Sequence, residues 1–212
     1  MFILSEYQVI ELFDGVSCAL LAAAASAKAR AQGSHLSGAA ALGFICGILG
    51  PLVREMLLHG ETGGQLIIKL LPDDVFIGSL GGIAAVRLVS RLPVVFWLDA
   101  LSVSFASVLG CLLALQELGI AAGLCLGLIC GFLPGVFRDV ALGDLADLVE
   151  KDWYASSCVL GCVIGMCVFM SPFFFSPLAI MENRLLEISC LSGIACAFLL
   201  QIKNSKKIRQ GC

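Results

Sequence analysis

Charged residues are scarce in this sequence of 212 residues. Asp, Glu, Lys and Arg together make up 14% of the chain, against 59% hydrophobic residues, and the mean hydropathy is +1.01. A water-soluble domain needs about a quarter of its residues charged to cover its surface. The charges here are spread so unevenly that apolar stretches of roughly 18 to 25 residues remain, long enough to cross a bilayer. The composition excludes a soluble globular protein and predicts an all-α integral membrane protein.

The residue patterns of enzymes and metal sites are also missing. The chain has two histidines, His35 and His59, without convincing partners, and none of its 11 cysteines forms a CxxC pair. No Walker motif, nucleophile elbow or HExxH motif occurs. We therefore expect no enzymatic activity, no metal, no cofactor and no nucleic-acid partner. Most of the cysteines lie in apolar segments and are expected to pack there as small apolar side chains.

The sequence does contain one stretch that occurs twice. Residues 42–55 read LGFICGILGPLVRE and residues 126–139 read LGLICGFLPGVFRD, at a constant offset of 84. Each copy is an apolar run with a Gly/Pro pair inside it and an arginine beside a carboxylate at its end. Glycine and proline are unfavourable in a helix interior by about 1 and 3 kcal/mol. Two copies of this unfavourable feature predict an internal repeat built around interrupted helices, kinked at Gly/Pro.

Seven membrane spans are predicted from the apolar stretches. The third is the weakest, because it contains both Arg87 and Arg91. A basic tail, residues 203–212, follows the last span. No linker or low-complexity segment divides the chain, so we expect a single membrane domain. The predicted spans are 8–28, 36–58, 74–92, 94–115, 119–142, 154–174 and 179–202.

The repeat extends to whole groups of spans. The first three spans form one repeat over residues 8–92, the next three form a second over residues 94–175, and a seventh helix, 178–202, stands outside both. Asp14 and Asp99 occupy equivalent places, each about 40 residues before the arginine of its repeat. Because each repeat holds an odd number of spans, the second is inserted upside down. Inverted repeats of this kind are an architecture of transporters and channels.

The placement of lysine and arginine predicts the orientation. No cleavable signal peptide is expected, because the first 14 residues carry Glu6 and Glu11 and no positive charge. With the N-terminus outside, nine basic residues fall on the cytoplasmic side and two outside, leaving aside the repeated arginines. We therefore predict an outside N-terminus and a cytoplasmic C-terminus. The cytoplasmic set is Lys28, Arg30, Arg87, Arg91, Lys151, Lys203, Lys206, Lys207 and Arg209, and the outer set is Lys69 and Arg184.

Small residues recur at every fourth position along two of the predicted spans. Such faces let helix backbones approach closely in lipid, where packing drives association. The stripes predict helix contacts, either within one subunit or between subunits. The helix-packing positions are Gly43 and Gly47 in the second span and Gly119, Gly123, Gly127 and Gly131 in the fifth.

With its repeated motif, its two early aspartates and its three-plus-three-plus-one spans, the chain resembles the prokaryotic TRIC-type trimeric intracellular cation channels over roughly residues 8–202. A domain of this family is also labelled as a glycine transporter. The family pattern in the second and fifth helices is Gly-Gly-Gly-x-x-Arg-Asp. This chain departs from it, with Leu49-Gly50-Pro51 and Glu55 in one copy and Leu133-Pro134-Gly135 and Asp139 in the other. Proline changes the local backbone, because it fixes φ and removes an N–H.

The resemblance implies a homotrimer in the inner membrane of the cell, with one pore in each subunit. It implies a channel for monovalent cations, potassium foremost, gated near the kinked second and fifth helices. The alternative is a secondary carrier for glycine or another small amino acid, in which an arginine would hold the substrate carboxylate. A scaffold without transport activity is a third possibility. The expected partners are thus further copies of the chain, K⁺ and the lipid bilayer.

Arg54 and Arg138 are the leading site residues. An arginine at membrane depth is unfavourable by about 2.5–3.5 kcal/mol and usually faces a cavity or a partner. Alternatively, each lies near a helix end and pairs with a carboxylate for structural reasons. The carboxylate that directly follows each arginine points elsewhere on a regular helix, so we expect Asp14 or Asp99 from a neighbouring helix as the partner. These aspartates either line a cation path or cap their helices.

The Gly/Pro pairs, Gly50-Pro51 and Pro134-Gly135, are predicted pore or gate positions. They leave backbone carbonyls without helical donors, and such carbonyls can coordinate a cation. A purely structural kink is the alternative. The acidic loop 144–152 is interpreted either as a solvated loop or as a vestibule that attracts cations.

Overall fold

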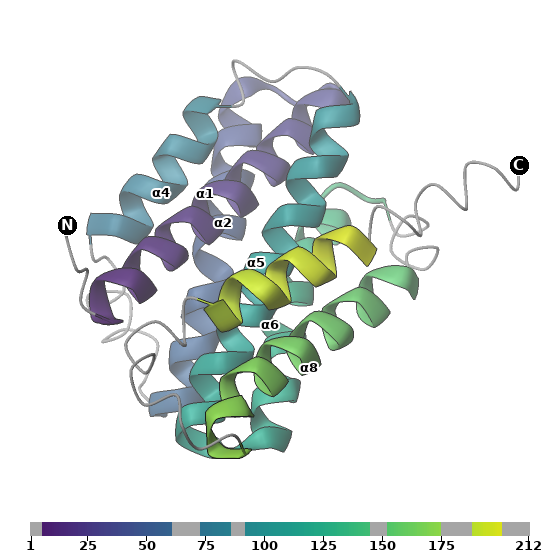
Figure 1. Cartoon of the computed structure of the whole chain (residues 1–212). Coiled ribbons are helices and arrows are strands. Elements are labelled where there is room, and N and C mark those ends of the chain that lie inside the picture. The colour runs from purple at the N-terminus through teal and green to yellow at the C-terminus, as the bar shows by residue number, and fades with distance from the viewer. Residues whose placement is uncertain (1–5, 61–72, 86–91, 145–151, 175–187, 201–212) are drawn as a thin grey trace, which may run out of the picture.

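The computed structural model of the chain describes residues 6–60, 73–85, 92–144, 152–174 and 188–200, which are helical apart from short turns (Figure 1). Each of the seven predicted spans contains one helix, which confirms the expected all-helical architecture of these residues. The helices are α1 (Glu6–Ala31), α2 (Leu36–His59), α4 (Asp73–Ala85), α5 (Leu92–Leu118), α6 (Ile120–Ala141), α8 (Asp152–Phe174) and a last helix, Ile188–Leu200.

Some sequence predictions concern residues outside these ranges. The basic tail (203–212), Arg87 and Arg91 of the third span and most of the acidic loop 144–152 lie there. So do most of the basic residues on which the orientation was based. The outside N-terminus and the cytoplasmic C-terminus therefore stay predictions.

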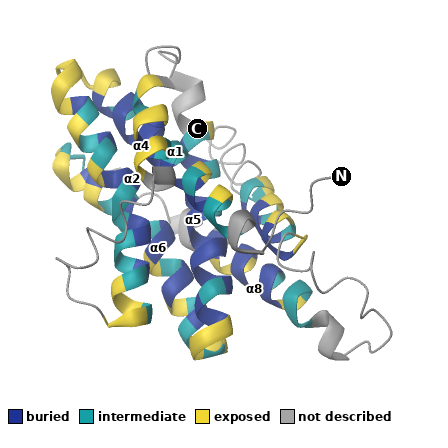
Figure 2. Cartoon of the chain, turned by 90° about the vertical axis from the view of Figure 1, so that its left-hand side faces the viewer, coloured by how far each residue is buried: buried dark blue, intermediate teal, exposed yellow. Residues whose placement is uncertain are grey.

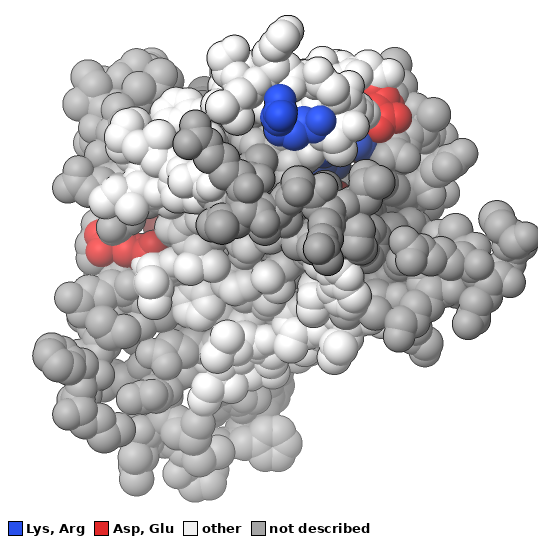
Figure 3. All heavy atoms as spheres, turned by 90° about the horizontal axis from the view of Figure 1, so that it is seen from above, with Lys and Arg blue, Asp and Glu red and all other residues white. Residues whose placement is uncertain are grey.

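Apolar side chains cover much of the outer surface. Helices α1, α2, α5 and α6 each contain an apolar stretch of 22 to 24 residues, long enough to cross a bilayer. Ile77 and Leu199 are 63% and 64% exposed. On the face shown in Figure 3, charged side chains are confined to a few places among the described residues. Lipid solvates such a surface, whereas water does not, so the chain is a multi-pass membrane protein.

The helices form two groups of three. In the first group α1 packs against α2 and α4, and in the second group α5 packs against α6 and α8 (Figure 1). The groups meet where α1 contacts α5 and where α2 contacts α6. In the last helix, Cys190 and Ile194 join a core cluster with Val108 and Leu112 of α5. The two groups have the same membership as the predicted repeats, and their inverted relation remains a prediction.

Cysteines fill the interior as small apolar side chains. The described cysteines are free thiols, and seven of them are buried. Cys111 and Cys162, for example, belong to the main core between α5 and α8, and Figure 2 shows buried residues lining the inner faces of the helices. Cys125 and Cys167 are exposed, so the packing interpretation holds for most cysteines and not for these two.

Glycines allow neighbouring helices to touch through their backbones. A Cβ atom at Gly127 of α6 would lie 2.6 Å from the carbonyl oxygen of Ser107 in α5, closer than real atoms approach. The other crowded positions of the two predicted stripes likewise face helices of the same chain. They are Gly43 against α1, Gly47 against α1 and α4, Gly123 against α5 and α8, and Gly131 against α5.

Gly119 does not pack against another helix, which corrects one prediction. It lies between α5 and α6 with a φ of 91°, and no atom lies within 4 Å of where its Cβ would be. This left-handed backbone conformation favours glycine, because a side chain would clash with the backbone. Gly119 therefore reverses the chain direction between two packed helices.

The contact between α4 and α1 offers a matched pair of substitutions. A Cβ at Gly82 would lie 2.1 Å from the carbonyl oxygen of Ala19, whereas no atom lies within 4 Å of a Cβ at the adjacent Gly81. We expect Gly82→Ala to lower the free energy of unfolding by about 1–3 kcal/mol, because α4 must move away from α1. Gly81→Ala should leave it unchanged or raise it by up to about 1 kcal/mol. Denaturant titrations in detergent micelles measure both, and equal effects would contradict the packing described here.

Both repeated motifs lie inside continuous helices. α2 runs unbroken through Pro51, and α6 runs unbroken through Pro134. The prediction of interrupted helices is therefore wrong for the described conformation, although each proline still removes one helical hydrogen bond. The helices meet at these positions, where the Cys130 thiol donates to the Gly50 carbonyl over 3.8 Å. A Cβ at Gly50 would lie 3.6 Å from the Cys130 carbonyl oxygen, an ordinary van der Waals distance, so glycine is not required for this approach.

Candidate functional site

The first candidate site is a buried ion pair between α1 and α2. The two terminal nitrogens of Arg54 donate to the two carboxylate oxygens of Asp14 over 2.6 and 2.7 Å. Arg54 is only 6% exposed and Asp14 9%. This bidentate geometry is the strongest form of the arginine–carboxylate interaction. The expected partner of this arginine on a neighbouring helix is confirmed.

Glu55 also binds Arg54, which corrects the expectation that it points elsewhere. One Glu55 oxygen accepts from Arg54 Nε over 3.2 Å and from Nη2 over 3.1 Å. The Cβ atoms of adjacent helical residues diverge, but an arginine side chain is long enough to bend back toward the next residue. The other Glu55 oxygen lies 3.0 Å from His59 Nδ1, a contact one helical turn away that the four-residue spacing could have suggested.

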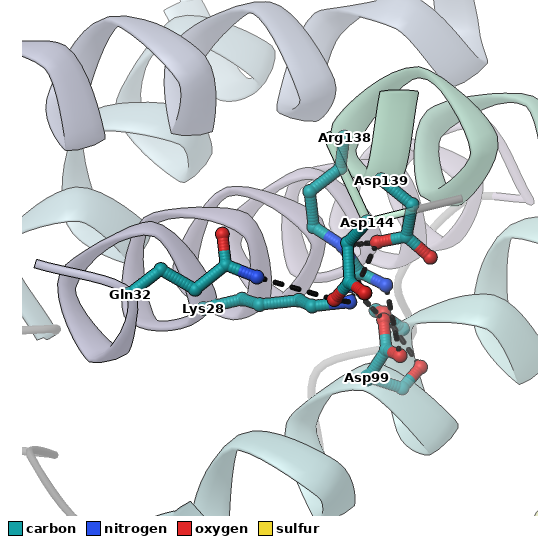
Figure 4. Close-up of polar contacts among 7 residues, drawn as sticks. Lys28, Gln32, Asp99, Arg138, Asp139 and Asp144 are labelled. Atoms are coloured by element: carbon teal, nitrogen blue, oxygen red, sulfur yellow. Dashed lines mark hydrogen bonds and ion pairs between the residues drawn. The ribbon is translucent and has the colours of Figure 1, made fainter. Parts of the chain in front are cut away.

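The second candidate site repeats this arrangement between α5 and α6 (Figure 4). Arg138 donates through Nη1 and Nη2 to the two oxygens of Asp99, and through Nε to Asp139 over 2.7 Å. Arg138 is 3% exposed and Asp139 2%. Each repeated arginine therefore binds two carboxylates. One belongs to the aspartate in the first helix of its own group, and the other belongs to the residue that directly follows the arginine in sequence.

Lys28 of α1 adds a second positive charge to the Arg138 site. Its ammonium lies 3.0 Å from Asp139 and 3.0 Å from Asp144 (Figure 4). Gln32, four residues later in the turn that follows α1, donates to Asp144 over 3.1 Å. Sequence reasoning used Lys28 only as a topology signal, because no motif relates it to α6. Its role depends on how the two groups of helices pack.

A glycine turn places Asp144 beside this site. α6 ends at Ala141, and Gly143 follows with a φ of 72°. The Asp144 amide then donates to the Asp139 carbonyl over 2.9 Å. This is a Schellman-type helix end, which needs a left-handed residue and so favours glycine. The turn directs Asp144 back toward the end of α1.

The two arginine sites lie at different depths along the molecule. Asp14 contacts the Arg54 site and Lys28 contacts the Arg138 site, and both residues belong to α1. Fourteen residues separate them, which is about 21 Å at 1.5 Å per helical residue. In a hydrocarbon layer of about 30 Å, that separation suits two sites in opposite halves of the membrane.

A small cavity lies between the Arg54 site and the α2–α6 contact. Its volume is about 10 Å³, enough for one water molecule. The structure thus brings Asp14, Gly50, Pro51 and Arg54 together here, while Asp99 and Arg138 form the other site. Pro134 is buried on α6, and a Cβ at Gly135 would meet no neighbour. The cavity is lined by Asp14, Ser17, Gly50, Pro51, Arg54, Ala106, Leu109 and Cys130.

Within the described ranges, no three His, Cys, Asp or Glu side chains are grouped so that they could hold a metal ion. The carboxylates that do cluster form ion pairs with arginine and lysine side chains. The chemistry available at both sites is therefore electrostatic, and the cavity beside Arg54 adds space for a single small molecule there.

Comparisons with known proteins find one family model and two solved structures that resemble this chain. Residues 96–170 match the family model described as "Glycine transporter". The structure resembles a crystal structure of a prokaryotic TRIC channel in 0.5 M KCl, with a TM-score of 0.73, 22% identity and coverage of 93% of this chain and 98% of that chain. It also resembles the TRIC trimeric intracellular cation channel orthologue from Rhodobacter sphaeroides, with a TM-score of 0.73, 22% identity and coverage of 92% and 96%. No curated protein matches the sequence. The chain thus has the fold of these channels.

Proposed function

We propose that the protein is a channel for monovalent cations, with potassium as the preferred ion and one pore in each subunit of a homotrimer. It would act in the inner membrane, with its N-terminus outside and its C-terminus in the cytoplasm. The similarity of nearly the whole chain to solved cation channels supports this proposal. Arg54, Arg138, Asp14, Asp99 and the Gly/Pro positions of α2 and α6 are the proposed pore and gate residues.

The observation that carries the proposal is the charge balance at the two sites. A lone arginine in a pore would repel cations, but Arg54 faces two carboxylates, those of Asp14 and Glu55. At the other site, two basic side chains, Arg138 and Lys28, face three carboxylates. Each site therefore carries one more negative than positive charge when the carboxylates are ionised and His59 is neutral. Such sites attract cations.

The same contacts make the carrier alternative less suitable. The family model that matches residues 96–170 is labelled as a glycine transporter, and an arginine would be the natural partner of a glycine carboxylate. However, all three nitrogens of Arg54 already donate to carboxylates, and so do those of Arg138. In this conformation neither guanidinium is free to hold a substrate.

The cavity beside Arg54 suits a closed channel. It holds about one water molecule, which is less space than an ion with its hydration shell requires. Opening would need α2 and α6 to separate near Gly50 and Cys130. The missing hydrogen bonds at Pro51 and Pro134 make these the places where the two helices can bend.

We expect purified protein in liposomes to conduct potassium down its gradient and to leave labelled glycine outside. A potassium-sensitive dye and glycine uptake, measured on the same vesicles, compare the two functions directly. Empty liposomes are the control for leakage. Glycine accumulation without potassium conductance would overturn the channel proposal in favour of the carrier.

A further inference from the structure

One set of ionic contacts joins the two groups of helices. The contacts of Arg54 with Asp14 and Glu55 stay within the first group, and those of Arg138 with Asp99 and Asp139 stay within the second. Lys28, in contrast, belongs to the first group and binds Asp139 and Asp144 at the end of α6 in the second.

The surroundings of Lys28 strengthen this contact. The side chains of Lys28 and Asp139 are only 13% and 3% exposed, so water screens the pair weakly. Gln32, in the turn after α1, also donates to Asp144. α1 ends at Ala31, one residue after Arg30, and the Ser34 N–H then donates to the Ala29 carbonyl over 3.0 Å. Lys28 therefore lies in the last turn of a helix whose end is closed by a backbone hydrogen bond.

We propose that Lys28 is a positioning residue of the gate: its contacts with Asp139 and Asp144, here called the Lys28 latch, hold the end of α6 against α1 and keep this end of the channel closed. The inference rests on the proposed channel function. For ions to pass this end, α6 must move away from α1, and the two ion pairs oppose that movement. The Arg54 site lacks an equivalent bridge in the described residues, since His59 reaches only Glu55 of its own helix.

The latch can be removed without leaving a bare buried charge. Asp139 keeps its 2.7 Å contact with Arg138 when Lys28 is lost. Asp144 is 28% exposed, so water can solvate its carboxylate. Lys28→Met keeps the length and the apolar stem of the side chain and removes only the ammonium. This variant is therefore expected to fold.

Two cysteines report separately on the two ends of the channel. Cys46 of α2 is 1% exposed and lies close enough to Arg138, Asp99 and Asp139 to feel their charges. Cys130 of α6 is 3% exposed and lines the cavity beside Arg54. The two ends are taken to open independently, so loss of the latch should speed the reaction of Cys46 and leave the reaction rate of Cys130, beside the α2–α6 contact, at its wild-type value. Each thiol can be followed by mass spectrometry of its own peptide.

The test compares Lys28→Met, Lys28→Arg and Arg30→Met with the wild-type full-length protein. We expect Lys28→Met to raise potassium flux in liposomes roughly three- to tenfold and to speed the reaction of Cys46 with a small polar thiosulfonate by a similar factor, because a tenfold shift in the open population needs only about 1.4 kcal/mol. Lys28→Arg keeps the charge and should behave as wild type. Arg30 is exposed and donates only to the Ser34 carbonyl among the described contacts, so Arg30→Met removes the same charge without touching the latch.

Three results have distinct meanings. If Cys46 stays protected in Lys28→Met, or if Arg30→Met raises flux and Cys46 reactivity equally, the latch is overturned. If Lys28→Met exposes Cys46 while neither variant nor wild type conducts potassium, the latch is supported and the channel function fails. If Cys130 becomes reactive together with Cys46, the whole bundle has loosened and a latch at one end is overturned.

Discussion

Replacement of Arg54 by glutamine is expected to lower the free energy of unfolding by about 3–5 kcal/mol. The guanidinium binds both oxygens of Asp14 at 2.6 and 2.7 Å, and the two side chains are 7% and 13% exposed. Glutamine is too short to satisfy that carboxylate, so a buried negative charge would lose its counter-charge. Denaturant titration of the purified protein in a mild detergent gives the difference directly.

The double variant Arg54→Gln with Asp14→Asn distinguishes two contributions to the loss of stability: the loss of the ion pair itself, and the cost of leaving the buried Asp14 carboxylate charged without a partner. Both side chains are then neutral, and the loss of stability should fall to about 1–2 kcal/mol, because the buried Asp14 charge is removed with its partner. Glu55, which also loses Arg54, is 28% exposed and can be solvated by water. Arg30→Gln is the control for loss of an exposed arginine and should change stability by less than about 0.5 kcal/mol. A similar loss in the single and double variants would show that the Asp14 charge is solvated by water in the native protein.

Arg138→Gln is expected to raise potassium flux about tenfold. The variant leaves Lys28 facing three carboxylates, so the site gains one unit of negative charge. A unit charge acting on an ion 4 Å away changes its energy by about 4 kcal/mol at an effective dielectric of 20. Screening and side-chain movement reduce this value, but 1.4 kcal/mol already gives a tenfold effect. Flux into liposomes, normalised to the amount of folded protein, measures the change.

Arg138→Gln with Asp99→Asn is the matched control for this charge effect. It removes one positive and one negative charge, so the net charge of the site stays the same and flux should return to within about threefold of wild type. If the single variant conducts like wild type, Arg138 lies outside the ion path and its assignment to the gate is wrong. If flux falls in both variants, the arginine holds the open conformation instead of acting as a barrier.

These predictions treat the two arginine sites as related but not equivalent. Each arginine binds an aspartate of its own group and the carboxylate that follows it. The additional cation differs: His59 lies 3.0 Å from Glu55 at one site, and Lys28 lies 3.0 Å from Asp139 at the other. The ionic contacts of Lys28 with Asp139 and Asp144 cross between the groups, whereas the contacts of Arg54 and Arg138 described above stay within them, which is why the latch is placed at that end.

Much of the architecture could be predicted from local patterns. Apolar length predicted the seven helices, since a helix in lipid must satisfy its own backbone over about 20 residues. The equivalent places of Asp14 and Asp99, each about 40 residues before an arginine, indicated these two aspartates as possible partners, and the structure pairs each with the arginine of its own group. The glycine stripes indicated close helix contacts, and the structure adds that Gly43 and Gly127 make them within one chain.

The sequence by itself determined the helices, their apolar surface and the two aspartates as candidate partners of the arginines, because these depend on composition and on spacings that recur along the chain. Only the tertiary structure decided that α2 and α6 continue through their prolines, that Glu55 and Asp139 turn back to their arginines, and that Lys28 reaches α6. Packing against neighbouring helices supports a proline-containing helix that propensity alone disfavours. The reach of long side chains and the crossing of separate helix groups depend on side-chain conformation and on distances in space, and neither leaves a periodic signal in the sequence.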